Sequence, residues 1–361
     1  MTGSATPRVL HINDCAFSTT NLMTAARRCG LPWRYQPLAV TDPAWHGVGR
    51  IVRRGVRGAG WLARLAANAA RADLLHIHFA TVVQHTGWVP RPYVLHLHGT
   101  DIRSYQYDPH LGPLVRRAVE GARAVLYSTP DLAPHIRWRE DARLFPVPID
   151  VAALPTWQPD PVPTVFFASR WDEVKGSGVQ LAAARALGTL AGVRILGIDW
   201  GPDAAAARAA GVTLLPRLAH ADFLAALARA HVVVGQPTGM LAASELEALG
   251  IGVPVVAPLQ GEWYVESGAA VPPVLGGTAL ADAHVLPPQD PATGGVRMLA
   301  AAEIAALAEA VAALAAEALA DPAAASARLE GAAWLAAKHG ADAGVVRLLG
   351  LYPRVLDGGR P

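Results

Sequence analysis

Short apolar runs that suit β-strands alternate with helix-like segments along this chain, and the alternation occurs twice. Such a rhythm is typical of βαβ units, in which helices join parallel strands and cover the sheet. The strand-like runs of the first half are Arg8–Ile12, Leu74–His78, Tyr93–Leu97, Ala124–Tyr127 and Leu144–Val147. Those of the second half are Thr164–Ala168, Val193–Ile198, Val212–Leu215, His231–Val234 and Val253–Ala257. The pattern predicts an α/β protein of two doubly wound, Rossmann-like domains that face each other across a cleft.

A proline-rich stretch separates the two series. Six prolines lie between Pro146 and Pro163, a density typical of a stiff linker. We therefore expect a first domain over residues 1–150, a second over 151–338, and a last helix within 339–361 that returns toward the first domain. Residues 266–298 have little periodicity and many Gly and Pro, which predicts a loop, and alanine-rich helices are expected over Ala300–Ala320 and Pro322–Lys338.

The composition limits where such a protein works. The apolar runs are short and interrupted by Gly, Pro or Arg, so no membrane span is expected. Thr6-Pro7-Arg8 leads directly into the first strand without a signal-peptide pattern. The two cysteines, Cys15 and Cys29, provide neither a disulfide framework nor a metal-binding spacing. These features favour a cytoplasmic protein.

Two segments that follow strands of the second half carry candidate chemistry. Ser169-Arg-Trp-Asp-Glu-Val-Lys-Gly176 opens a helix, and its Arg170 and Lys175 can converge on one anion, for which a diphosphate is the natural ligand. Lys175 is one of only two lysines in the chain, against 29 arginines, which suggests that its compact ammonium is needed. The alternative is a solvated turn that carries charges of both signs.

The second segment is Gly235–Gly250. Gly239 allows a backbone to approach a ligand closely. Glu245 and Glu247 lie two positions apart on a helix and point to different faces, so only one of them can face the site. The alternative is that these carboxylates only stabilise the helix N-terminus.

Together the two segments resemble the retaining family-four glycosyltransferases of the GT-B fold, which show R-x4-K-G and a later E-A-(M/L)-A-x-G-x-P-V-V. The resemblance continues in the first half, in order along the chain. The matching segments are Asp73–His78, His98-Gly-Thr-Asp101, Tyr127–Pro130 and Pro146–Asp150. It implies that Arg170 and Lys175 hold the diphosphate, that Glu247 binds the ribose hydroxyls, and that His98 contacts the donor sugar. The nucleotide sugar is then a substrate, and no cofactor is expected.

The resemblance also implies which other residues surround the two substrates. Ser169, Met240 and Leu241 lie in the donor-side loops, together with Gly239 and Glu245. Ser18, Thr19, Asp101 and Arg103 lie in loops of the first half, on the acceptor side.

Two departures from the family pattern concern the sugar end of the donor and the first loop. The first glutamate of the family's E-x7-E pair falls at Gly239. Either backbone amides at Gly239–Leu241 replace it, or Glu245 contributes, or activity is reduced or lost. The loop after the first strand lacks the usual Gly-Gly, and there Ser18 and Thr19 either cap the helix or face an anion.

Two H-x-H pairs, His76/His78 and His96/His98, lie on strands. Alternate residues share a face, so each pair could contribute to a metal site. No later strand offers a clear set of further ligands, so we expect no metal. For His76, His78 and His96 we expect positions in the core or in the wall of the cleft.

Residues 50–65 are the last notable segment. Arg50, Arg53, Arg54 and Arg57 share one helical face and adjoin apolar residues, which suits an anionic membrane surface or an acidic acceptor. An ordinary solvated helix is the alternative. Nucleic acid is not expected as a partner, because few aromatics are interleaved and the whole chain carries a net charge of only +2.

These observations predict a metal-independent, retaining transfer of a sugar from a UDP- or GDP-linked donor to an acceptor hydroxyl. Three alternatives remain open at this point. They are a metal-dependent hydrolase that uses the H-x-H pairs, a GT-B protein that binds a sugar nucleotide without turnover, and an epimerase of the same fold. The sequence names neither the base, nor the sugar, nor the acceptor.

Overall fold

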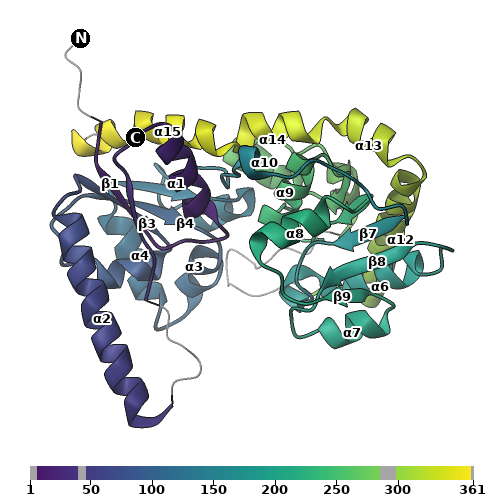
Figure 1. The fold of residues 1–361 in the computed structure, drawn as a ribbon, viewed down its shortest axis with the longest axis horizontal. Coiled ribbons are helices and arrows are strands. Elements are labelled where there is room, and N and C mark those ends of the chain that lie inside the picture. The colour runs from purple at the N-terminus through teal and green to yellow at the C-terminus, as the bar shows by residue number, and fades with distance from the viewer. Residues whose placement is uncertain (1–5, 40–45, 285–297, 359–361) are drawn as a thin grey trace. The chain divides into compact units, whose positions relative to one another are not determined.

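The computed structural model describes residues 6–39, 46–284 and 298–358. The chain divides into two compact units (Figure 1). Unit 1 comprises the described residues of Met1–Ser128, Ile136–Asp150 and Ala341–Pro361, and unit 2 comprises those of Thr129–His135 and Val151–Gly340. These bounds differ from the expected division at residues 150 and 338 mainly because Thr129–His135 lies with unit 2.

Unit 1 is built on a sheet of six parallel strands in the order β2-β1-β3-β4-β5-β6. Its strands are β1 (Val9–Ile12), β2 (Arg34–Gln36), β3 (Leu74–His78), β4 (Tyr93–Leu97), β5 (Ala124–Tyr127) and β6 (Arg143–Leu144). The order reverses direction between β1 and β3, which is the switch point at which doubly wound sheets open a crevice for ligands.

The strands of unit 1 are joined by α-helices and by short 3-10 helices. The α-helices are α1 (Ser18–Arg28), α2 (Gly47–Ala69), α3 (Thr100–Arg103), α4 (Gly112–Gly121) and α15 (Ala341–Leu356). The 3-10 helices are η1 (Ala80–His85) and η2 (Tyr105–Tyr107). The core lies where α1 and α15 cover the sheet, around Leu22, Leu74, Val345 and Tyr352. In Figure 1 the 23-residue α2 extends well beyond this sheet, and Gly55, Gly58 and Gly60 lie inside the helix.

Unit 2 is also built on six parallel strands, in the order β12-β11-β10-β7-β8-β9. Its strands are β7 (Thr164–Phe167), β8 (Arg194–Ile198), β9 (Thr213–Leu215), β10 (Val232–Val234), β11 (Val255–Pro258) and β12 (Leu275–Gly276). Counted within the unit this is the Rossmann order 3-2-1-4-5-6 read from the opposite edge, with the switch point between β7 and β10.

Helices cover the sheet of unit 2. The first of them are η3 (Pro130–Leu132), α5 (Ala133–Ile136), η4 (Val151–Ala153), η5 (Glu173–Lys175), α6 (Ser177–Leu187), α7 (Ala204–Ala209) and α8 (His220–Leu227). The others are α9 (Ala243–Ile251), α10 (Gly261–Ser267), α11 (Gly277–His284), α12 (Ala301–Ala320), α13 (Pro322–Leu329) and α14 (Gly331–His339). The core combines apolar strands with the alanine-rich faces of α6 and α12, since small side chains let these helices pack closely.

Two expectations about the second half are wrong. The segment Pro322–Lys338 is two helices, because Glu330 takes a left-handed φ of 51° between them. A Cβ on Gly331 would lie 2.9 Å from the Leu249 side chain, so the break lets the backbone pack against α9. The expected loop over 266–298 contains β12 and α11, and its residues 285–297 lie outside the described part.

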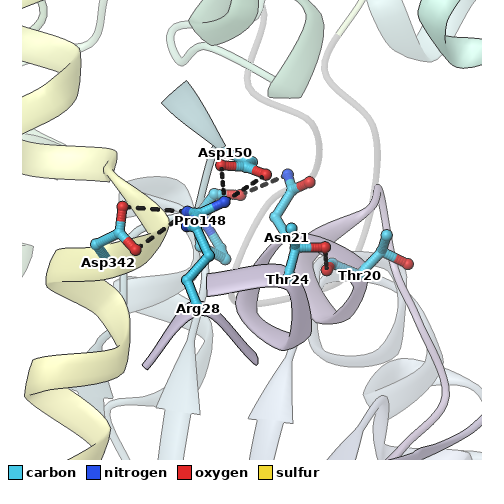
Figure 2. Close-up of polar contacts among 7 residues, drawn as sticks. All are labelled: Thr20, Asn21, Thr24, Arg28, Pro148, Asp150 and Asp342. Atoms are coloured by element: carbon cyan, nitrogen blue, oxygen red, sulfur yellow. Dashed lines mark hydrogen bonds and ion pairs between the residues drawn. The ribbon is translucent and has the colours of Figure 1, made fainter. Parts of the chain in front are cut away.

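A polar cluster holds the C-terminal helix α15 to unit 1 (Figure 2). The Arg28 guanidinium lies 2.9 Å from the buried Asp150 carboxylate and 3.0 Å from the exposed Asp342 of α15. The Asn21 amide donates to the Pro148 carbonyl over 2.9 Å. These contacts fix α1, α15 and the segment after β6 to one another.

Among the described residues, no helix combines the length and the apolar character needed to cross a membrane.

Candidate functional site

The two sequence segments of unit 2 meet at the switch point of its sheet. One follows β7 and the other follows β10, and these strands pair directly, with Val234 opposite Phe167. Gly176 has a φ of 70°, and a Cβ there would lie 2.4 Å from Cγ of Pro237. Glycine is thus required at residue 176 twice over, by its backbone conformation and by the close approach of the second loop. The fold brings together what the sequence separates by some sixty positions.

The guanidinium of Arg170 is held in place by its neighbours. Its Nε lies 3.0 Å from the Asp172 carboxylate, which also caps η5 by accepting a hydrogen bond from Val174 N–H. Its Cζ lies 5.8 Å from the centre of the Trp200 ring. Trp171 is fully buried and donates through Nε1 to the Ile198 carbonyl, so this loop is tied to the end of β8.

Lys175 and Ser169 flank the same loop. The amide of buried Gln180 donates to the Ser169 hydroxyl over 2.9 Å and to the Lys175 carbonyl over 2.7 Å. This side chain therefore joins the end of β7 to the last residue of η5. It holds Lys175 at the carboxyl end of the sheet, close to where α6 begins.

The loop after β10 is organised by Glu245. Its buried carboxylate accepts from Gln236 N–H at 2.9 Å, from Ala242 N–H at 3.1 Å and from the Ser244 hydroxyl at 3.0 Å. Glu245 thereby caps α9, so its contacts support the structural alternative to a donor-binding role. Gly239 has a φ of 81°, a conformation that glutamate adopts only with strain, and its carbonyl accepts from Gln260 N–H. Met240 and Leu241 are buried between these anchors.

Glu247 lies on the other face of α9, as the spacing predicts. Its carboxylate is buried, and Oε1 lies 2.7 Å from Nε2 of His220, the first residue of α8. The hydrogen bond to Glu247 raises the pKa of His220 above its ordinary value of 6.5, against the effect of burial. Sequence reasoning missed His220 because nothing in its neighbourhood along the chain marks it.

Two more side chains at this edge were also missed. Trp200 follows β8 with nearly half of its surface exposed, and the Arg217 guanidinium lies 4.8 Å from its ring centre. An exposed indole flanked by two guanidinium groups is a flat surface that suits a planar aromatic ligand. The only available signal in the sequence was the position of each residue directly after a strand.

In unit 1 the loop after β1 is strained and closed by its own carboxylate. Ala16 and Phe17 adopt left-handed φ values of 49° and 60°, where Gly-Gly would be unstrained. Asp14 accepts from Thr19 N–H at 2.9 Å and from the Thr20 hydroxyl at 2.6 Å. Ser18 and Thr19 are fully buried, and the Thr19 hydroxyl donates to the Asn13 carbonyl. Asp14 thus supplies the cap and the negative charge at the start of α1, where we expected Ser18 and Thr19 to act.

The loop after β4 is held by Asp101. This buried carboxylate accepts from the backbone N–H groups of Ala80, His98, Gly99 and Ile102. Burial raises the pKa of Asp101 to about 6, although those four hydrogen bonds lower it. Gly99 has a φ of 129°, and a Cβ there would meet the Arg103 guanidinium at 3.1 Å. Asp101 therefore shapes the loop, while Arg103 and the half-buried His98 lie on its surface.

Five histidines of unit 1 pack together: His11 of β1, His76 and His78 of β3, and His96 and His98 around the end of β4. Two sets of three could hold a metal, because their ring nitrogens lie within 4.8 Å of one another: His11, His76 and His78, and His78, His96 and His98. The His76 and His78 rings, however, stack nearly parallel, 4.4 Å apart at 8°. Imidazole lone pairs lie in the ring plane, so stacked rings do not aim at one point as tetrahedral zinc requires. The first of the two sets therefore does not fit a metal without rotation of the rings.

The chain was compared with protein-family models, curated proteins and solved structures, and only the solved structures gave matches. No family model matches the sequence, and no curated protein matches it. Among solved structures, the chain is similar to a sucrose-phosphate synthase from Thermosynechococcus elongatus, with 18% identity, a TM-score of 0.66, and coverage of 98% of this chain and 100% of that one. The chain has the GT-B fold.

Two further GT-B structures differ in what their names describe. HepE from Anabaena in complex with UDP-glucose has 15% identity and a TM-score of 0.60, covering 96% of this chain and 99% of that one. A UDP-N-acetylglucosamine 2-epimerase, so named provisionally, from Listeria monocytogenes has 13% identity and a TM-score of 0.55, covering 98% and 97%. The expected fold class is confirmed, and at these identities the likeness extends to the fold alone.

Proposed function

We propose that this chain is a glycosyltransferase that moves a sugar from a UDP- or GDP-linked donor to an acceptor hydroxyl, with retention at the anomeric carbon. One observation carries the proposal. At the switch point of unit 2, the loop with Arg170 and Lys175 packs through Gly176 against Pro237 of the loop that leads to Glu247. Cations on one side of a crevice and a buried carboxylate near the other suit the two ends of a nucleoside diphosphate.

The reaction needs stabilisation of charge on the leaving group. Breaking the bond between the anomeric carbon and the phosphate oxygen leaves an additional negative charge on the diphosphate. Fixed cations at that point stabilise the charge as it develops, and they require no metal ion. Asp172 and Trp200 hold Arg170 in place before the donor arrives, so less ordering is needed during the reaction.

The nucleoside would lie along the same edge. Glu247 would accept hydrogen bonds from the ribose hydroxyls, and the exposed Trp200 ring would stack on the base. The similarity to HepE, whose structure contains UDP-glucose, supports a uridine donor as the first choice for the test.

Donor binding and turnover are tested separately. Thermal shift with UDP, GDP, ADP and their sugars measures stabilisation of the folded chain, and release of the nucleoside diphosphate in the presence of EDTA measures turnover without metal. Lys175→Ala should lower turnover at least a hundredfold, about 3 kcal/mol of transition-state stabilisation. Lys338→Ala is the matched control, because Lys338 is the only other lysine and is exposed. Equal turnover by both variants would contradict the role of Lys175.

Stereochemistry and the competing function are decided by the product. Proton NMR of the product should show the same anomer as the donor. The likeness to the Listeria epimerase favours one alternative, conversion of the donor sugar with no acceptor present. Appearance of a second donor sugar in an acceptor-free incubation would replace transfer by epimerisation.

We also propose that α2 provides a peripheral contact with an anionic membrane. Ile51, Val52 and Val56 are each more than half exposed, and the arginines of the same helix lie beside them. An exposed apolar stripe bordered by arginine suits the headgroup region of an anionic bilayer. Co-sedimentation with vesicles that contain phosphatidylserine should be lost in Ile51→Asp/Val56→Asp, and binding that persists in this variant would contradict the contact. Since a cytoplasmic location is expected from the sequence, we propose that this contact forms at the inner face of the membrane.

A further inference from the structure

A continuous line of hydrogen-bonding groups runs through the core of unit 1. The Tyr352 hydroxyl of α15 lies 3.3 Å from Nε2 of His11. Nδ1 of His11 lies 3.2 Å from Nε2 of His78, and Nδ1 of His78 lies 3.0 Å from Nε2 of His98. The Tyr352 hydroxyl also lies 2.7 Å from Nδ1 of His76. Tyr352, His11, His76 and His78 are completely buried, whereas His98 reaches the loop surface.

We propose that Tyr352, His11, His78 and His98 form one directional hydrogen-bonded chain that fixes which nitrogen of His98 carries its proton, and that Tyr352 is a positioning residue that couples His76 to this chain. The inference rests on the proposed function only for what His98 touches. The chain itself follows from distances within unit 1.

The direction follows from the number of protons. A neutral imidazole has one N–H donor and one bare nitrogen, and a tyrosine hydroxyl donates once. Burial keeps all of these histidines neutral by lowering their pKa values, to about 3 in the case of His11 and His98. Each link then needs one donor and one acceptor. If His98 carries its proton on Nδ1, then His78, His11 and His76 must do so too. If it carries the proton on Nε2, all four must be Nε2–H.

His76, the last residue of the chain of hydrogen bonds, decides between the two directions. Nε2 of His76 is buried and has no hydrogen-bond partner of normal geometry. In the Nε2–H direction this atom would be an orphaned donor, and in the Nδ1–H direction it is a bare acceptor. Orphaned buried N–H groups are the rarer of the two. The chain therefore runs from His76 through the Tyr352 hydroxyl and His11 to His78 and His98, with every histidine in the Nδ1–H form.

The consequence for the loop after β4 is a preset donor. Nε2 of His98 accepts from His78, so its Nδ1–H remains to be donated at the carboxyl end of the strand. Such a group recognises an oxygen atom, either a sugar hydroxyl or a phosphate oxygen, and not a ligand N–H. In a histidine, the hydrogen bond at one ring nitrogen decides which nitrogen carries the proton. The donor on His98 is therefore set by His78, and the form of His78 is set in turn by His11 in the core.

The test is a long-range proton–nitrogen NMR spectrum of the histidine-labelled protein at pH 8. His11, His76, His78 and His98 should all show the Nδ1–H pattern. In Tyr352→Phe the ring still packs against Trp33, whose centroid lies 5.3 Å away, but the hydroxyl is lost. His76 then has no partner at either ring nitrogen and should become a mixture of tautomers. His11, His78 and His98 should keep the Nδ1–H form, because the reverse direction would leave an orphaned N–H on His11. The matched control is His96→Phe, because the His96 and His98 ring centroids lie only 4.2 Å apart but His96 stands outside the chain. It should leave all four histidines unchanged.

The outcomes separate this inference from the proposed function. Different tautomers among the four histidines of the wild type would overturn the chain even if Tyr352→Phe did not fold. An unchanged His76 signal in folded Tyr352→Phe would overturn the role of Tyr352, and a His98 that changes its tautomer in this variant would overturn the direction of the chain. If no donor is turned over, the NMR result still decides the chain.

Discussion

Acidification should open unit 1 well before unit 2, because five histidines pack neutral in its core. Burial lowers the pKa of His11, His76, His78, His96 and His98, and for His11 and His98 the value is about 3. Their ordinary value is 6.5, which applies to the unfolded chain. Below pH 6.5 the unfolded chain thus binds protons that the folded unit does not. The free energy of unfolding of unit 1 is therefore highest above pH 6.5 and falls as the pH is lowered, because protonation of these histidines favours the unfolded chain.

The magnitude depends on the unfolded value once the folded pKa lies well below the test pH. At pH 5 each such histidine lowers the free energy of unfolding by about 2 kcal/mol, so five lower it by about 10 kcal/mol. Asp101 acts in the opposite direction, because its folded pKa of about 6 lies above the ordinary 3.8. At pH 5 its protonation raises the free energy of unfolding by about 1.4 kcal/mol. The net loss is comparable to the whole stability of a typical domain, about 5–15 kcal/mol.

Hydrogen exchange followed by mass spectrometry resolves the two units in one sample. At pH 5, after correction for the intrinsic exchange rate, peptides from β1, β3 and β4 should lose most of the protection that they have at pH 8. Peptides from β7, β8 and β10 serve as the internal control. In unit 2 the pKa of His220 is raised by Glu247 and that of His231 is lowered by burial, so their effects oppose each other.

His96→Phe sharpens the same experiment. The ring nitrogens of His96 have no hydrogen-bond partner of normal geometry, so phenylalanine preserves a ring at this position and removes one protonation. The variant should recover about 2 kcal/mol of the loss at pH 5. Equal protection of β1, β3 and β4 at pH 8 and pH 5 in the wild type would refute the reasoning, since it would mean that the folded cluster accepts protons readily.

Three further substitutions test the structure locally, and denaturant unfolding measures each of them. Gly176→Ala should lower the free energy of unfolding by more than about 2 kcal/mol and weaken donor binding, because left-handed strain adds to the collision with Pro237. Gly192→Ala has a similar φ but open space around it and should lose only about 1 kcal/mol, so equal losses would exclude the collision. Arg28→Met should lose about 3 kcal/mol by leaving the buried Asp150 carboxylate unpaired, whereas Asp342→Asn, at the exposed end of the same cluster, should change stability by less than about 1 kcal/mol; a larger effect at Asp342 would reverse this assignment. Ala16→Gly should stabilise by up to about 1 kcal/mol, since it relieves a left-handed φ, and a destabilised variant would show that this φ is not strained.

The central strands could be predicted closely, and the edge strands could not. β3, β4 and β5 begin and end where the sequence predicts, because each is a short run of apolar residues, with histidines in β3 and β4, that is largely buried on both faces. β2 and β12 contain three and two residues and lie at sheet edges, where few side chains must be apolar. The break at Glu330 was also hidden, since alanine-rich sequence favours helix on both sides and the cause is the contact of Gly331 with Leu249.

The candidate site could be predicted where its residues directly follow a strand within a recognisable run. Arg170, Lys175 and His98 were chosen in this way, and their roles stay predictions. Glu245 was grouped with them because a capping glutamate and a ligand-binding glutamate have the same local sequence, and only the hydrogen bonds to Gln236 and Ala242 distinguish them. Trp200 and His220 required the sheet order, which places the end of β8 beside that of β7 and the end of β9 beside that of β8.

The histidines show what spacing alone misses. The H-x-H pairs indicate shared faces on two strands, and a metal is the ligand that such a pattern first suggests. The structure adds His11 from β1 and Tyr352 from the C-terminal helix, and these partners use the ring nitrogens that a metal would need. Tyr352 lies 341 positions from His11, so no pattern along the chain could pair them. A buried cluster of this kind stays folded only while it is neutral, and neutrality in turn allows the chain to have a single direction. The acid sensitivity of unit 1 and the fixed proton of His98 are therefore two consequences of the same packing.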